Sequence, residues 1–191
     1  MPLLARRLRL PPDENAEPAL LQRQTELAVQ IARFAEQDGI HATAVDTLSL
    51  IRASQPTDPI HAVHKPALSI VAQGREQVTL ADEVYLHDAS QYLVVTLDLP
   101  IVGQVVQASR NCPYLCLRLD LEPAQIGALL LSLGLPASSS PHHERGLFLG
   151  EASLPLIEAA LRLLRLLDTP EDIPVLAPSA ICEILCRLLM D

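Results

Sequence analysis

Residues 66–73 read PALSIVAQ, and the chain continues with QVTL at 77–80, VYLH at 84–87 and YLVVTL at 92–97. Turn residues at 74–75, 81–82 and 88–90 separate these runs, and short β-branched runs joined by tight turns are typical of hairpins. Pro100 is expected to end the fourth run, while 102–108 and 114–121 supply two further strands. Short strands at this spacing favour a sandwich, jelly roll or barrel.

The composition indicates an acidic protein with one aliphatic core. Of the 191 residues 49% are hydrophobic, none is Trp and only 3% are aromatic, so Leu, Val and Ile must pack the core. The formal net charge of -9 repels phosphate backbones and anionic lipids, which argues against nucleic-acid binding by this stretch of chain. The uncharged run 123–143 is interrupted by glycines, prolines and serines, so it is not expected to span a membrane. The sequence therefore predicts a cytoplasmic protein.

The chain divides into an N-terminal helical segment at 1–43, a β-region at 44–150 and a helical hairpin at 151–191. In the first part, apolar residues recur at helical spacing from 17 to about 38, where Asp38-Gly39 supplies the stop. In the third part, leucines cover so much of the first helix that it needs two packing partners. We expect one face of the hairpin to cover the β-structure and the other to meet a second subunit. The expected dimer residues are Leu156, Leu163, Leu167, Leu185 and Leu189.

The four cysteines fall as two pairs, Cys112 with Cys116 and Cys182 with Cys186. If the strand at 114–121 reaches back to Cys112, the first two sulfurs lie about 13 Å apart, too far to share an ion. The second pair is one helical turn apart, so its thiols can approach, but two ligands alone do not make a zinc site. Small buried thiols in a reducing compartment are the simpler interpretation.

A set of short motifs runs from about residue 48 to the end of the chain. They are LSIVAQG at 68–74, VTL at 78–80, VY at 84–85, YLV at 92–94, DLP at 98–100, AS at 108–109, PY at 113–114, RLLRLLD at 162–168, VLAP at 175–178, EIL at 183–185 and RLL at 187–189. Together they resemble the N-terminal domain of one branch of the AraC-type transcriptional regulators of bacteria. The chain departs from the family at Ala81, in a tight turn where the family often has Gly.

The resemblance implies an α+β fold, with a cupin-like β-barrel or jelly roll between an N-terminal helix and a C-terminal helical hairpin that can mediate dimerisation. It also implies a following DNA-binding domain with two helix-turn-helix motifs, which this chain does not contain. Residues 186–191 end inside an apolar-periodic helix with no cap, so we expect the chain to be part of a longer regulator.

A standalone cupin-type enzyme, an isomerase or dioxygenase acting on a small polar substrate, is the main alternative. Its metal site needs a close His pair on one strand, a carboxylate and a third His that converge on the ion. His61 and His64 are three residues apart, so they point to opposite faces of a strand, and His142-His143 lie in a serine-rich loop. The chain also has no nucleophile elbow and no phosphate-binding loop. The sequence therefore predicts no metal, no cofactor and no catalytic residue.

The strand at 114–121 carries the clearest indication of a ligand site. Leucines alternate there with Tyr114, Cys116, Arg118 and Asp120. If the leucines meet the helices, Tyr114 and Arg118 face the barrel mouth, where the Arg fork can hold a carboxylate or sugar hydroxyls. A solvated polar face is the alternative. The remaining predicted ligand residues are His64 and Lys65, just before the first barrel strand, and Gln104, on the strand at 102–108.

The resemblance to AraC-type regulators implies a sensor that controls transcription. A small-molecule effector would enter the barrel and shift the hairpin or the homodimer, which changes how the DNA-binding domains are presented. DNA would be contacted only through those domains. A purely structural dimerisation domain is a third possibility, favoured by a solid barrel without a cavity.

Overall fold

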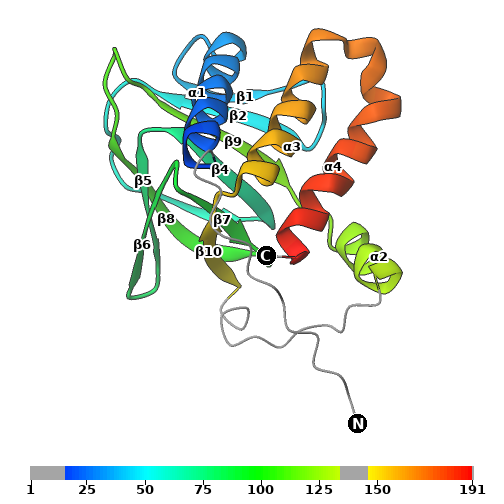
Figure 1. Cartoon of the computed structure of the whole chain (residues 1–191). Coiled ribbons are helices and arrows are strands. Elements are labelled where there is room, and N and C mark those ends of the chain that lie inside the picture. The colour runs from blue at the N-terminus through cyan, green and yellow to red at the C-terminus, as the bar shows by residue number, and fades with distance from the viewer. Residues whose placement is uncertain (1–15, 134–145, 191) are drawn as a thin grey trace.

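The protein folds as two antiparallel β-sheets with helices on one side (Figure 1). The structure is a computed structural model, and it describes residues 16–133 and 146–190. His142 and His143 lie outside the described residues. The strands are β1 (Gly39–Ala42), β2 (Leu48–Ala53), β3 (Ile60–His64), β4 (Ala67–Gln73), β5 (Arg75–Leu80), β6 (Glu83–Asp88), β7 (Gln91–Val95), β8 (Leu99–Gln107), β9 (Tyr114–Asp120) and β10 (Leu147–Glu151). The helices are α1 (Ala16–Phe34), α2 (Pro123–Leu133), α3 (Leu154–Arg165) and α4 (Ile173–Met190), with short 3-10 turns η1 (Leu166–Asp168) and η2 (Pro170–Asp172) between the last two.

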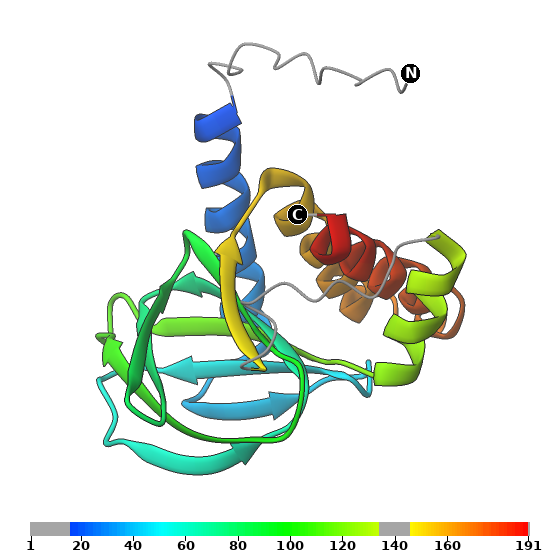
Figure 2. The same ribbon diagram turned by 90° about the horizontal axis from the view of Figure 1, so that it is seen from below.

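The two sheets face each other and form a barrel-like ring of strands, with the helices beside it (Figure 2). The larger sheet has the strand order β1-β2-β9-β4-β7-β10, and the smaller has the order β3-β8-β5-β6. Apolar side chains of both sheets meet in the interior, for example Val78 and Ile101 of the smaller sheet with Leu93 and Val95 of the larger. The expected α+β architecture of a β-barrel between an N-terminal helix and a C-terminal helical hairpin is confirmed.

The chain passes from one sheet to the other at Gly74, between β4 and β5. β4 pairs with β7 and β9, whereas β5 pairs with β6 and β8, so the hairpin predicted at 74–75 is wrong. Gly74 has a φ of +83°, a left-handed conformation that glycine adopts at little cost. The next expected hairpin is confirmed, because Leu80 of β5 pairs with Glu83 of β6. Its turn residue Ala81 has a φ of +52°, a left-handed conformation that glycine adopts more easily than alanine.

Two element ends differ from the sequence prediction. Pro100 lies within β8, opposite Val63 of the edge strand β3, rather than ending a strand. Proline lacks a backbone N–H but is tolerated near the start of a strand, which is where Pro100 stands. Helix α1 ends at Phe34, earlier than the expected stop at Asp38, and Gly39 instead opens β1.

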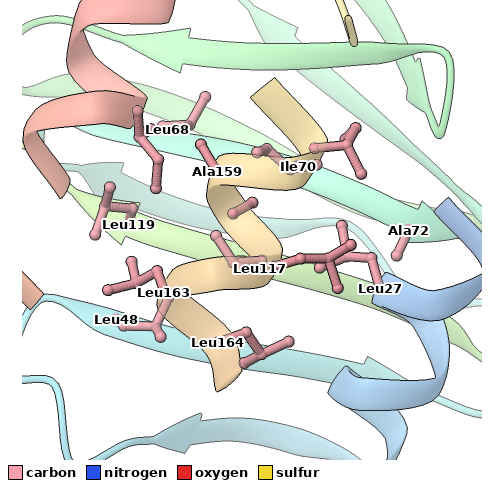
Figure 3. Packing of buried hydrophobic residues seen from close by; sticks show 14 of the residues in the cluster. Leu27, Leu48, Leu68, Ile70, Ala72, Leu117, Leu119, Ala159, Leu163 and Leu164 are labelled. Carbon is pink, nitrogen blue, oxygen red and sulfur yellow. The ribbon is translucent and has the colours of Figure 1, made fainter. Parts of the chain in front are cut away.

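Helices α1 and α3 cover the outer face of the larger sheet. Figure 3 shows leucines of β2, β4 and β9 packed against Ala159, Leu163 and Leu164 of α3. Ion pairs also join the two helices: Arg23 lies 3.5 Å from Glu158, and Arg165 bonds to Glu26. The N-terminal helix is therefore part of the same packed layer as α3.

Helix α4 packs beside α3 and leaves the apolar side chains of Val175, Leu176 and Met190 exposed. Its buried residues are Ala177, Ile184 and Leu185. Among the described residues, Pro170–Met190 is the one helical stretch with the length and composition of a membrane span, and only 17% of its apolar window is buried. An apolar helix so poorly covered by its own chain is typical of a surface that meets another molecule.

His87 of β6 is fully buried, and we expect it to make the fold sensitive to acid. Burial lowers the pKa of His87 to about 4, against the smaller opposing effects of its hydrogen bond with Gln91 O and the charge of Asp88. The unfolded chain takes up this proton near pH 6.5, but the folded chain does so only near pH 4. The contribution of neutral His87 to the free energy of unfolding is therefore fully present at neutral pH. It falls as the pH drops between these values, by about 3 kcal/mol at the lower end.

Urea unfolding from pH 7.5 to about pH 4 measures this loss. The variant His87→Gln keeps an N–H donor toward Gln91 but does not titrate, so most of the acid slope should disappear. The matched control His61→Gln, at an exposed position of β3, should keep the slope. A slope that survives unchanged in His87→Gln would show that carboxyl groups, not His87, govern the acid sensitivity.

Candidate functional site

Strand β9 has two different faces, and its inner face carries the polar residues. Leu115, Leu117 and Leu119 pack with α1 and α3 in the main core. Tyr114 and Cys116 lie between the two sheets instead, with Ala53, Val71 and Val105 as apolar neighbours. Since the leucines meet the helices, the condition for an inward-facing Tyr114 is met.

Polar side chains from β3, β5 and β9 converge beside these apolar neighbours. The Tyr114 hydroxyl donates a hydrogen bond of 2.7 Å to Oε2 of Glu76 on β5. The Arg118 guanidinium lies close enough to Glu76, Cys116 and His64 to shift the pKa of all three. We call His64, Glu76, Tyr114, Cys116 and Arg118 the polar cluster.

The surroundings set the protonation of the polar cluster. Burial raises the pKa of the Glu76 carboxyl, and the Tyr114 hydrogen bond and the Arg118 charge oppose this only in part. Burial, followed by the Glu76 charge, raises the pKa of Cys116 to about 12, and burial also raises the pKa of the Tyr114 phenol. Burial and then Arg118 lower the pKa of His64. At neutral pH the Cys116 thiol is therefore protonated and a poor nucleophile, and Arg118 is the permanent positive charge.

The polar cluster has hydrogen-bond donors that can hold a polar ligand. Arg118 donates through Nε to Asp120 at 3.1 Å and through Nη2 to Lys65 O at 3.3 Å, and a guanidinium has five N–H donors in all. Gly103 of β8 accommodates the Glu76 carboxylate itself, because a Cβ there would lie 3.2 Å from Oε1 of Glu76. Within residues 16–133 and 146–190, no three His, Cys, Asp or Glu side chains are placed to hold a metal ion.

The structure brings three of the predicted ligand residues together and leaves two outside. His64, Tyr114 and Arg118 belong to the polar cluster. Lys65 contributes only its backbone carbonyl, and its residue is exposed. Gln104 lies on the face of β8 opposite to Val105 and donates to Thr57 O at 3.0 Å, so it holds the loop between β2 and β3.

Glu76 is the member of the polar cluster that the sequence analysis missed. On β5 it lies on the same face as Val78 and Leu80, so it is the one carboxylate among apolar side chains on that face of the strand. That alternation was available in the sequence, but a hairpin assumed at 74–75 hid the start of β5. Cys116 is fully buried, as expected for a structural thiol, while Cys112 lies exposed in the loop before β9.

The expected dimer residues differ in how much of their surface is free. Leu156 and Leu163 of α3 have no exposed surface, because they pack against the barrel. Leu185 of α4 is buried as well, and Leu167 and Leu189 are half-buried. Beside α4, an apolar groove of about 690 Å³ separates this helix from α2.

Comparison with protein families identifies the chain. The sequence model described as "AraC-type transcriptional regulator N-terminus" matches residues 44–191. The chain belongs to this family. The matched region thus includes strands β2 to β10 and the helical hairpin, while α1 and the edge strand β1 precede it. No curated protein matches the chain significantly.

Solved structures with a similar arrangement include ToxT from Vibrio cholerae. The apo ToxT K231A variant of strain SCE256 is 10% identical, with a TM-score of 0.48 over 66% of this chain and 52% of that chain. Wild-type ToxT of the same strain with bound unsaturated fatty acid is 10% identical, with a TM-score of 0.46 over 65% of this chain and 47% of that chain. A cupin-2 domain protein from Shewanella frigidimarina is 11% identical, with a TM-score of 0.28 over 39% of this chain and 69% of that chain. This chain spans about half the length of the ToxT chains that it matches.

Proposed function

We propose that this AraC-type domain senses a small organic effector between its two sheets and thereby controls a DNA-binding domain elsewhere in a longer regulator. The observation that carries the proposal is the polar cluster, which lies next to apolar side chains of both sheets. A fixed guanidinium beside a protonatable carboxyl and a phenol suits an effector that carries a carboxylate or several hydroxyl groups. The cytoplasm is the proposed location, and an enzymatic role is not proposed.

Strand β9 is a physical route from the effector to the helices. Tyr114 and Arg118 belong to its polar face, while Leu117 and Leu119 of the other face pack against α3. An effector that pulls Arg118 away from Asp120 and Lys65 O would shift β9 and, through its leucines, α3. Such a shift alters the regulator only if the effector binds one arrangement more tightly than the other.

A homodimer through the outer face of α4 fits the exposed surface best. Val175, Leu176 and Met190 are large apolar residues of α4 with exposed side chains. Leu156 and Leu163, which the sequence analysis assigned to the dimer, are buried within one chain and would not reach a partner. We therefore place the dimer contact on α4, where Leu189 is the predicted residue nearest to Met190.

The proposed function is tested first by DNA binding. Full-length regulator and this 191-residue chain are compared on the promoter region next to the gene, at moderate and high salt. Specific binding by the full-length protein but not by this chain is expected. If neither binds, the assignment as a transcription regulator fails, and analysis for metal and turnover becomes the next step.

The effector site is tested by thermal unfolding with a panel of carboxylic acids and monosaccharides. A compound that binds should raise the melting temperature, and Arg118→Gln should weaken its binding at least about 10-fold, because a charge-assisted hydrogen bond contributes about 1.5–3 kcal/mol. Arg110→Gln, at an exposed loop position, is the matched control and should bind normally. Equal binding by both variants would place the effector outside the polar cluster.

A further inference from the structure

Cys182 and Cys186 place two thiols on one face of helix α4. They are one helical turn apart, so their Cβ atoms are about 5–6 Å from each other. Cys182 is exposed and Cys186 is half-buried, and the Cys182 thiol is near enough to raise the pKa of Cys186. Cys182 also lines the groove between α2 and α4. The pair is therefore an accessible dithiol beside an apolar hollow.

Two common roles of paired cysteines do not suit this geometry. A disulfide needs Cβ atoms about 3.5–4.5 Å apart, which is closer than helical neighbours one turn apart. A structural zinc site needs four ligands, and the described part of the chain holds no group of three candidate metal ligands. The pair instead suits a ligand that requires two sulfur atoms and no further protein group.

The groove next to Cys182 suits an organic substituent on such a ligand. Its volume is about 690 Å³. Ala128 and Leu129 of α2 and Ile181 and Leu185 of α4 give its walls an apolar character. Burial in this groove would remove an aryl or alkyl group from water, which contributes about 25 cal/mol per Å² of apolar surface.

We propose that Cys182 and Cys186 bind a trivalent organoarsenical whose organic group lies in the groove between α2 and α4. An organoarsenic(III) oxide condenses with the two S–H groups: two As–S bonds form, the As=O bond breaks, and both protons leave with the oxygen as one water. Arsenic stays trivalent, so the step needs no oxidant or reductant. Two sulfurs and one carbon complete the coordination of the arsenic. The site is separate from the polar cluster and does not depend on the effector proposed for it. It lies on the same outer face of α4 as the proposed dimer contact, with Cys182 seven residues from Val175 and Cys186 four from Met190, so an arsenical bound there would compete with that dimer.

The surroundings of the pair are compatible with this condensation. Burial and the neighbouring Cys182 thiol raise the pKa of Cys186, while Arg187 opposes the shift. Cys186 therefore carries the S–H proton that leaves as water. Soft thiol ligands also select soft, thiophilic elements over hard cations such as Mg²⁺ or Ca²⁺.

The test is intact-mass spectrometry of the native 191-residue chain with equimolar phenylarsine oxide. We expect one phenylarsenic adduct, formed with loss of one water, that resists excess glutathione and is removed by dithiothreitol. Cys182→Ser and Cys186→Ser should each abolish the resistant adduct, whereas Cys112→Ser, which removes an exposed loop thiol, should retain it. Thermal melting confirms that the variants are folded. No adduct on the unsubstituted chain, or a resistant adduct on either α4 variant, would overturn the proposal.

A second pair of variants tests the role of the groove. Ala128→Glu places a carboxylate in the groove wall, whereas Ala124→Glu adds the same charge to α2 at an exposed position outside the groove lining. Phenylarsine oxide should bind Ala128→Glu about 10-fold more weakly than Ala124→Glu, because a phenyl ring in the groove would displace water from the neighbouring carboxylate. Arsenite, which has no organic group, should not distinguish the two variants. Equal phenylarsine oxide affinities would overturn the placement of the organic group.

Discussion

Replacing Gly74 with alanine is expected to destabilise the protein by about 4 kcal/mol. A Cβ at this position would lie 2.6 Å from Gln107 O and 2.9 Å from Tyr114 Cα, both of which are backbone atoms. Gln107 pairs with Arg75, and Leu115, the residue after Tyr114, pairs with Gln73, so neither strand can retreat without breaking its ladder. The positive φ adds backbone strain. Denaturant unfolding at neutral pH measures the loss.

Gly127→Ala is the matched control for this prediction. Gly127 lies in α2, and a Cβ there would meet nothing within 4 Å. Alanine in a helix interior should stabilise the protein by about 0.5–1 kcal/mol, because glycine loses more conformational entropy on folding. If Gly74→Ala is as stable as the parent chain, the close passage between the sheets at this corner is wrong.

Replacing Leu117 with alanine is expected to cost about 4 kcal/mol of unfolding free energy. Leu117 has no exposed surface and lies where β9 packs against α1 and α3. Truncation removes apolar burial and leaves a cavity that two helices and a sheet cannot close together. Because Leu117 belongs to the strand that carries Arg118, the substitution should also weaken the response of the helices to an effector.

Leu131→Ala shows what a leucine contributes without burial. Leu131 of α2 is 85% exposed, so its truncation should change stability by no more than about 0.5 kcal/mol. Unfolding curves of the two variants, measured side by side, should differ by several kcal/mol. A small loss for Leu117→Ala would mean that α1 and α3 do not cover β9 as described.

The candidate site shows how far local patterns lead. Alternation along 114–121 predicted that Tyr114 and Arg118 share a face, and the structure places that face toward the barrel. Glu76 was missed because the hairpin assumed at 74–75 hid the start of β5, and because its partner Tyr114 is far away in the sequence. Gln104 was predicted as a ligand residue from alternation alone, yet it lies on the other face of β8, where it donates a hydrogen bond to Thr57 O. A strand pattern separates two faces but does not say which of them is inside.

Local periodicity was sufficient for the strand-forming runs at 66–97, the amphipathic N-terminal helix and the helical hairpin, because these features depend on neighbouring residues. The resemblance to AraC-type regulators came from short sequence motifs. Long-range packing was required for the assignment of β4 and β5 to different sheets, for the contact of Glu76 with Tyr114 and for the burial of Leu156 and Leu163 against the barrel. Each of these depends on which distant segments pair or pack. The physical reason is that periodicity sets the orientation of a side chain within its element, whereas its environment is set by the partner that the element meets.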